Sequence, residues 1–350
     1  MSGNPLHHLR ITGSDIEFDC AAGDTVLRAA QRAGLGFPYE CNVGSCANCK
    51  FELVEGEVRM NWEQAPGWTE KDRARKRYLG CQARPLGDCH VKLRLDPHYA
   101  PQVRPRRGPA VLLARREITA DISEFRFELE QPLDFQPGQY ALLYLPGVAG
   151  ARAYSMSNAF IAAGDDRRIW EFQVKRVPRG QGSNTLFDQV QAGDRLEIDG
   201  PYGMAWLRRD APRDILCLAG GSGLAPMISI ARAAMNEPRL GGRRLHFVYG
   251  GRTPGDICGE DMLRVLPGWG ERLHYHPAVS PPPVPTAGSP YADWGGLVGF
   301  VHDIALGLFG ERLSEMEIYF AGPPAMAAAV QRMLFEARVP AAQQHFDQFY

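Results

Sequence analysis

The sequence lacks long hydrophobic runs, and it lacks an excess of charge of either sign. No stretch approaches the roughly 18 consecutive apolar residues that a membrane-spanning helix requires, so we expect no membrane span. The formal net charge is -1, which argues against a nucleic-acid or membrane partner held by bulk charge. The first residues also lack the basic and apolar regions of a signal peptide, and we therefore expect a cytoplasmic protein whose thiols stay reduced.

Cysteine is scarce, and half of the 8 cysteines fall in one motif. Cys41, Cys46 and Cys49 share one short segment, and Cys81 follows later in the chain. This spacing is typical of a plant-type [2Fe–2S] cluster, in which four thiolates bind two irons. The small residue Gly44 lets the backbone wrap closely around such a cluster. We interpret the other cysteines, which are scattered, as small core residues.

Zinc is the alternative occupant of this motif, because four cysteines can also bind Zn²⁺ in tetrahedral geometry. Zinc ribbons usually supply their cysteines as two closely spaced pairs. Three cysteines in one segment with a distant fourth fit the iron–sulfur pattern better. We therefore predict that the cluster ligands are Cys41, Cys46, Cys49 and Cys81.

The length of 350 residues predicts two or three domains. We expect the cysteine motif to belong to a first domain over residues 1–97. Residues 9–18 alternate around a central turn as in a β-hairpin. Residues 25–33 carry the apolar face of a helix, with Asp24 as its N-cap and Gly34 at its end.

A dense basic run occupies residues 71–77, just before Cys81. It is either a docking patch for an acidic partner or a solvated helix face. The sequence supports the two interpretations equally.

A proline-rich, polar segment at residues 98–108 lacks periodic apolar positions and is predicted to be an extended linker. Beyond it we expect a second domain over residues 109–208, with strands at 110–114, 122–129 and 139–145. Regular short strands with little helix are typical of a small antiparallel β-barrel.

Two motifs predict that this barrel binds a flavin. In the first, the Arg152 guanidinium suits a flavin phosphate, the Tyr154 ring can pack on the isoalloxazine, and the Ser155 hydroxyl can reach flavin N5. The second motif precedes a helical run at residues 185–187, where glycines and a serine form a phosphate-binding helix N-terminus. Its predicted binding residues are Gly180, Gly182 and Ser183.

A third domain is expected over residues 209–350. It begins with an apolar strand at 214–219, followed by a glycine-rich turn and an apolar helix at 227–235. A buried parallel strand, a glycine turn and a helix N-terminus together form a cradle for a pyrophosphate. The predicted binding residues are Gly220, Gly221, Gly223 and Pro226. The proline-rich segment 280–290 is expected to be a surface insertion with no catalytic part.

The order of these parts covers essentially the whole chain. It resembles the reductase components of bacterial multicomponent oxygenases, within the ferredoxin–NADP reductase superfamily. The similarity to toluene monooxygenase reductases is especially close at residues 37–42, in the motifs at Arg152 and Gly220, and in the ending at 345–349. The resemblance implies a multidomain α+β and α/β fold. Its parts would be a β-grasp ferredoxin domain, an antiparallel β-barrel FAD domain and a parallel α/β NAD-binding domain.

The resemblance also implies further site residues. Arg252 would lie near the adenosine ribose, and Ala321, Gly322 and Pro323 would lie beside the nicotinamide. The family usually has a cysteine where this chain has Ala321, and its loss could loosen nicotinamide positioning. A terminal aromatic, for which we choose Phe349, would cover the flavin ring; ordinary docking of the C-terminus on the core is the alternative. The predicted catalytic residues are Tyr154, Ser155 and Phe349.

The implied function is electron transfer. NADH would give a hydride to FAD, and single electrons would then pass through the cluster to a protein acceptor. This acceptor would be a Rieske-type ferredoxin or the hydroxylase of a diiron or Rieske oxygenase that acts on an aromatic or related hydrocarbon. Two alternatives stay open: a reductase for a deoxysugar-forming dehydratase, and an NADH-responsive redox sensor. The choice of NADH over NADPH rests on the resemblance, because Arg252 or a neighbouring arginine could bind a 2′-phosphate.

Overall fold

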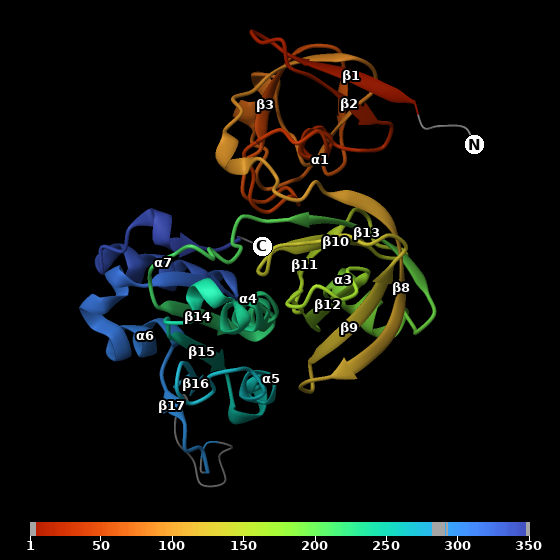
Figure 1. Cartoon of the computed structure of the whole chain (residues 1–350). Coiled ribbons are helices and arrows are strands. Elements are labelled where there is room, and N and C mark those ends of the chain that lie inside the picture. The colour runs from red at the N-terminus through yellow and green to blue at the C-terminus, as the bar shows by residue number, and fades with distance from the viewer. Residues whose placement is uncertain (1–4, 282–290, 292, 348–350) are drawn as a thin grey trace.

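The computed structural model describes residues 5–281, 291 and 293–347, which form three parts in chain order, each built around its own main sheet (Figure 1). Phe349 and nearly all of the proline-rich segment 280–290 lie outside the described residues. No helix within the described ranges is both long and apolar enough to cross a membrane.

The first part is a five-stranded mixed sheet in the order β2-β1-β7-β3-β5, with the pair β4-β6 beside it. Strands β1 and β2 pair antiparallel with Leu9 opposite Phe18, which confirms the predicted hairpin. The elements are β1 (Leu6–Ile11), β2 (Glu17–Ala21), α1 (Val26–Arg32), β3 (Lys50–Glu55), β4 (Val58–Met60), α2 (Glu70–Ala74), β5 (Arg77–Leu79), β6 (Ala83–Pro85) and β7 (Cys89–Lys92).

Helix α1 begins one residue later than predicted. Thr25, not Asp24, is its N-cap, because Thr25 has the extended backbone that precedes the first helical residue. Asp24 Oδ1 instead accepts a hydrogen bond from the Thr25 amide at 2.8 Å. The end agrees with the prediction, since Gly34 follows the C-cap residue Ala33 and takes the left-handed conformation, with a φ of +85°.

The second part is a six-stranded antiparallel sheet in the order β11-β10-β13-β8-β9-β12. Its two end strands approach each other through a bridge between Met156 and Phe172, so the sheet nearly closes into a barrel. The predicted strands are present, although β8 begins at Arg106, within the segment predicted to be a linker. The elements are β8 (Arg106–Glu117), β9 (Ile122–Leu129), β10 (Tyr140–Tyr144), β11 (Arg152–Ser155), β12 (Ile169–Lys175), α3 (Gln181–Asp188) and β13 (Arg195–Tyr202).

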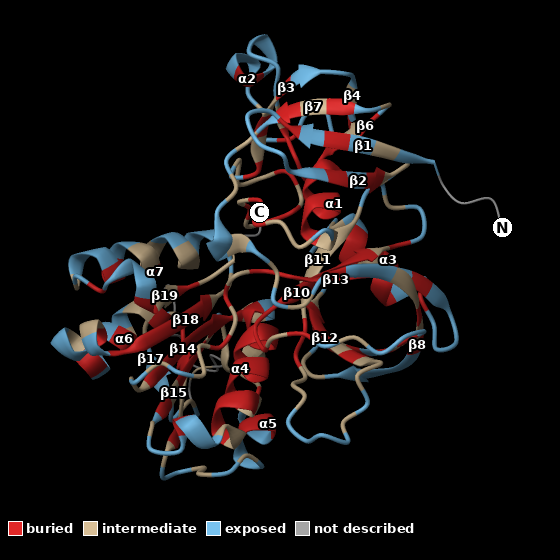
Figure 2. Cartoon of the chain, turned by 45° about the horizontal axis from the view of Figure 1, so that its top comes forward, coloured by how far each residue is buried: buried red, intermediate tan, exposed pale blue. Residues whose placement is uncertain are grey.

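The third part is a six-stranded parallel sheet in the order β17-β16-β15-β14-β18-β19. Apolar side chains from alternate positions pack against α4 and α5 on one face and against α6 and α7 on the other. Helix α4 is almost entirely buried, whereas α7 has an exposed outer face (Figure 2). The elements are β14 (Ile215–Gly220), α4 (Leu224–Asn236), β15 (Leu245–Gly251), α5 (Glu260–Arg264), β16 (Leu273–Val279), β17 (Leu297–Val298), α6 (Val301–Phe309), β18 (Glu317–Ala321), α7 (Pro324–Glu336) and β19 (Gln344–His345).

The first part packs directly on the barrel. Its hydrophobic core continues into the barrel through the buried side chains of Tyr140, Leu142 and Tyr202. The connecting segment also lies against the first part, where Gln31 Nε2 donates to the Tyr99 carbonyl at 3.2 Å. The predicted linker therefore joins two parts that share a continuous core.

Candidate functional site

The four motif cysteines lie at one end of the first part, in the segment between α1 and β3 and just after β5. Cys41, Cys49 and Cys81 are buried, and Cys46 is half-buried. All 8 cysteines of the chain are free thiols. The motif is therefore available to bind metal through sulfur.

The loop aims backbone amides at one of these thiols. The amide nitrogens of Val43, Ser45 and Cys46 lie 3.5, 3.3 and 3.4 Å from Cys41 Sγ. The hydrogen bond from the Cys46 side chain, helped by these amides, lowers the pKa of the Cys41 thiol to about 5. The thiolate is the form that binds metal, and amide donors tune the electronics of a bound cluster.

The four sulfurs are arranged as two pairs. The Cys41 and Cys46 side chains are hydrogen-bonded to each other, and so are those of Cys49 and Cys81. A single zinc ion would need four sulfurs about 2.3 Å from one point. Two pairs suit two irons, so the donor set fits a binuclear cluster.

One cavity of about 2190 Å³ joins the predicted cofactor residues. Pockets for single small ligands usually measure roughly 300–1,000 Å³, so a cavity of this volume has room for two nucleotides. The wall of the cavity extends to the cluster loop at Val43 and Ser45. It is lined by every predicted cofactor residue that the structure describes: Arg152, Tyr154, Ser155, Gly180, Gly182, Ser183, Gly220, Gly221, Gly223, Pro226, Arg252, Ala321, Gly322 and Pro323.

The flavin wall of this cavity is built from strand β11 and helix α3. Arg152, Tyr154 and Ser155 make up most of β11 and are half-buried. A Cβ atom on Gly182 would lie 2.7 Å from Arg152 Cγ, so the start of α3 lies directly against β11. The residues that line the wall thus combine a cation, a ring, a hydroxyl and the start of a helix, which fits a phosphate-bearing flavin.

Helix α3 begins four residues earlier than predicted, at Gln181, so Gly182 and Ser183 belong to its first turn. The Ser183 hydroxyl already accepts from the Val177 amide at 3.0 Å and lies 3.4 Å from the Gly180 carbonyl. Backbone amides of this turn are therefore better placed than the hydroxyl to serve a phosphate.

The nucleotide wall is the turn between β14 and α4. Helix α4 starts at Leu224, three residues before the predicted helix, and Pro226 lies in its first turn as expected. A Cβ atom on Gly223 would lie 1.9 Å from the Ala321 carbonyl oxygen. The Tyr249 hydroxyl also donates to the Gly221 carbonyl at 3.2 Å. The turn and the Ala321 segment therefore form one closely packed edge, where helix α4 can present its N-terminus to a pyrophosphate.

Sequence reasoning missed several charged residues of this cavity, among them Lys175 and Asp347. Lys175 ends strand β12 near the Gly221 turn and pairs with Asp121, whose carboxylate also lies 3.9 Å from Arg252. Asp347 lies in the terminal motif, two positions before Phe349, and its carboxylate accepts a hydrogen bond from the Met204 amide at 3.0 Å. The sequence signal that could have identified Asp347 is its position within the terminal motif at residues 345–349.

Asp347 makes stability depend on pH. Burial raises the pKa of its carboxyl to about 7, above the unfolded value of about 3.9. The stability that the protonated carboxyl contributes is complete below pH 4 and is lost as the pH rises through 7. We expect the thermal unfolding midpoint to fall between pH 5.5 and pH 8 in the natural protein and to change much less in Asp347→Asn. The exposed Asp303→Asn serves as control, and equal falls in all three proteins would contradict the prediction.

Three family models match the chain in the order of its three parts. A 2Fe–2S iron–sulfur cluster binding domain matches residues 9–86. An oxidoreductase FAD-binding domain matches residues 109–206, and an oxidoreductase NAD-binding domain matches residues 217–332. The cofactor set predicted from the sequence is confirmed by these matches.

Known proteins match over the whole length. The ferredoxin–NAD(P)⁺ reductase CarAd of Metapseudomonas resinovorans is 37% identical over 99% of this chain and 100% of its own. The ferredoxin–NAD⁺ reductase component of an alkene monooxygenase system of Xanthobacter autotrophicus is 36% identical over 95% of this chain and 97% of its own. The solved structure of a ferredoxin reductase in carbazole 1,9a-dioxygenase has a TM-score of 0.88 at 34% identity, over 99% of both chains.

The multidomain fold predicted from the sequence is therefore confirmed: a ferredoxin-type first part, a nearly closed antiparallel barrel and a parallel α/β part. The chain belongs to the family of ferredoxin–NAD(P)⁺ reductases that serve as reductase components of oxygenase systems, and it is an oxidoreductase that moves electrons from NADH through FAD to a [2Fe–2S] cluster.

Proposed function

We propose that the electron acceptor is a Rieske-type ferredoxin or the hydroxylase component of a diiron or Rieske oxygenase that acts on an aromatic or related hydrocarbon. The relatives support this proposal, because their names place them in carbazole dioxygenase and alkene monooxygenase systems. A cytoplasmic location is compatible with the free thiols and stays a prediction.

The internal electron path that would feed this acceptor is supported by one cavity that extends from the nucleotide turn to the cluster loop. FAD held in this cavity would supply the conversion of a two-electron hydride into single electrons. Arg152 and the start of α3 would hold flavin phosphates, and Tyr154 and Ser155 would orient the ring system. The turn at Gly220–Gly223 would hold the pyrophosphate of the nicotinamide nucleotide.

An anaerobic absorbance titration with NADH tests this electron path. We expect the purified protein to have a spectrum of flavin plus cluster, and NADH to bleach both components. Steady turnover with an added ferredoxin would contradict the alternative of a redox sensor. Stimulation of a sugar dehydratase without stimulation of any aromatic oxygenase would instead contradict the proposed acceptor.

The nucleotide preference is expected to favour NADH. Arg252 is the predicted cation near the ribose, and its side chain is 77% exposed, so it could meet a 2′-phosphate only in a solvent-screened setting. We expect Arg252→Ala to lower residual NADPH-driven rates roughly threefold, equivalent to about 0.6 kcal/mol, and to leave NADH-driven rates unchanged. Initial rates with both nucleotides measure this. Equal losses with NADH and NADPH would contradict a role at the 2′ position.

A further inference from the structure

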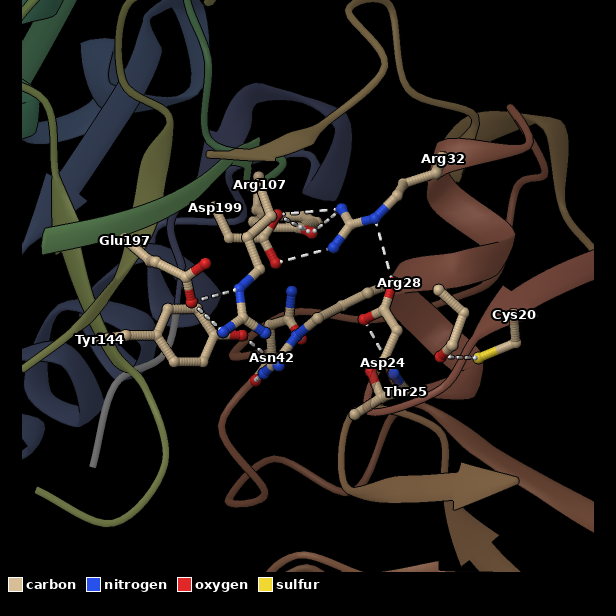
Figure 3. Close-up of polar contacts among 12 residues, drawn as sticks. Cys20, Asp24, Thr25, Arg28, Arg32, Asn42, Arg107, Tyr144, Glu197 and Asp199 are labelled. Atoms are coloured by element: carbon tan, nitrogen blue, oxygen red, sulfur yellow. Dashed lines mark hydrogen bonds and ion pairs between the residues drawn. The ribbon is translucent and has the colours of Figure 1, made fainter. Parts of the chain in front are cut away.

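Two arginines of helix α1 link the cluster part to the flavin barrel (Figure 3). Arg28 and Arg32 are four residues apart, so their side chains leave the same face of the helix. Both point away from the first part's sheet toward barrel strands β10 and β13, and neither belongs to the predicted cofactor set. Arg28 also lines the cofactor cavity, but the barrel contacts of both side chains are made to protein groups and so join the two parts.

Arg32 makes a two-pronged ion pair across the interface. Its two terminal nitrogens lie 2.9 Å from the two carboxylate oxygens of Asp199 on β13, which is fully buried. The Tyr202 hydroxyl donates to the same carboxylate at 2.9 Å, and Arg32 Nε pairs with Asp24 of its own part at 3.0 Å. Bidentate geometry fixes orientation as well as distance. Arg32 thus holds helix α1 at a defined place on the barrel.

Arg28 connects the same helix to the cluster loop. Its guanidinium is buried and donates to the Asn42 side-chain oxygen and to the Asn42 carbonyl, both at 3.2 Å. Its third contact is the hydroxyl of Tyr144 on β10, at 2.9 Å. Asn42 directly follows the cluster ligand Cys41. One side chain therefore holds both the cluster loop and the barrel.

The other flank of Cys41 is held by the same barrel strand. The Tyr140 hydroxyl of β10 donates to the carbonyl of Glu40 at 2.6 Å. Strand β10 pairs with the flavin strand β11, with Tyr140 opposite Ser155 and Leu143 opposite Arg152. The residues on both sides of a cluster ligand are thus tied to the strand that neighbours the predicted flavin residues.

We propose that Arg28 and Arg32 are positioning residues, a latch that holds the cluster loop on strand β10 and so fixes the cluster relative to the flavin pocket. The latch acts through Asp199 on one side and through Asn42 and Tyr144 on the other. The latch has this role only if electrons pass from flavin to cluster, as proposed above. It would dock the first part on the barrel in one fixed position.

The test compares Arg32→Ala with Arg10→Ala in the full-length protein carrying its cofactors. Arg10 lies in the same part and makes an exposed ion pair with Glu17, far from the barrel contacts. In Arg32→Ala we expect amide hydrogen exchange in residues 40–46 and 140–144 to become roughly tenfold faster. In anaerobic stopped-flow experiments we expect cluster reduction to slow roughly tenfold while NADH reduces the flavin at an unchanged rate. Arg10→Ala should change neither measurement.

Asp199→Asn provides a second route to the same answer if Arg32→Ala does not fold, because it keeps the size of the side chain and removes the charge that pairs with Arg32. Unchanged exchange and unchanged cluster reduction in the folded variant would overturn the latch. Equal slowing of flavin and cluster reduction would also overturn it, since that pattern indicates general damage. Failure of NADH to reduce the flavin of the natural protein would instead refute the electron path.

Discussion

Cys81→Ser is expected to remove the cluster and to reduce electron delivery to a one-electron protein acceptor to background. Cys81 is fully buried, it is paired with Cys49, and it is the ligand that comes from outside the loop. Because four thiolates hold the two irons, loss of one opens the site, and a serine hydroxyl does not replace a thiolate there. The flavin and the nucleotide wall lie in other parts of the chain, so NADH should still reduce the flavin.

The absorbance spectrum and the iron content of the variant measure the loss, and NADH oxidation with ferricyanide measures the remaining flavin activity. Cys20→Ser is the matched control, because Cys20 is equally buried in the same part and no cluster role is predicted for it. Cys20 donates to the Ala21 carbonyl, which a serine hydroxyl can also do. A Cys81→Ser protein that keeps two irons and an unchanged spectrum would contradict the assignment.

Local patterns allowed most of this fold to be predicted. The cysteine spacing, the hairpin and the glycine turn before α4 each depend on residues close in sequence, and each is present. The errors were also local. The sequence favours Asp24 as N-cap, whereas the structure has Thr25 there. Gly182 lowers the helix propensity ahead of residue 185, whereas α3 begins at Gln181.

The interface between the first two parts could not be predicted from the sequence. Arg32 and Asp199 are separated by 167 positions, and an arginine on a helix most often contacts solvent. Only the packed structure places the two together. The same holds for Asp347, whose raised pKa is caused by burial that no local pattern indicates.

Gly223→Ala is expected to abolish most NADH-driven reduction while leaving the other cofactors in place. The new Cβ atom would lie 1.9 Å from the Ala321 carbonyl oxygen, and neither backbone segment can yield by rotating a side chain. Overpacking of this kind typically costs about 1–3 kcal/mol and shifts the backbone. The shift would fall on the nucleotide turn, where a misplacement of about 1 Å can cost about 100-fold in rate.

Gly307→Ala is the matched control for this prediction, because Gly307 belongs to helix α6 of the same part and a Cβ atom there meets no atom within 4 Å. It should leave the rate unchanged, and alanine suits a helix better than glycine does. Dithionite bypasses the nucleotide and should reduce the flavin and the cluster of both variants equally. A Gly223→Ala protein that dithionite cannot reduce would point to a wider collapse of the fold. Unchanged NADH-driven rates would show that the turn does not position the nucleotide.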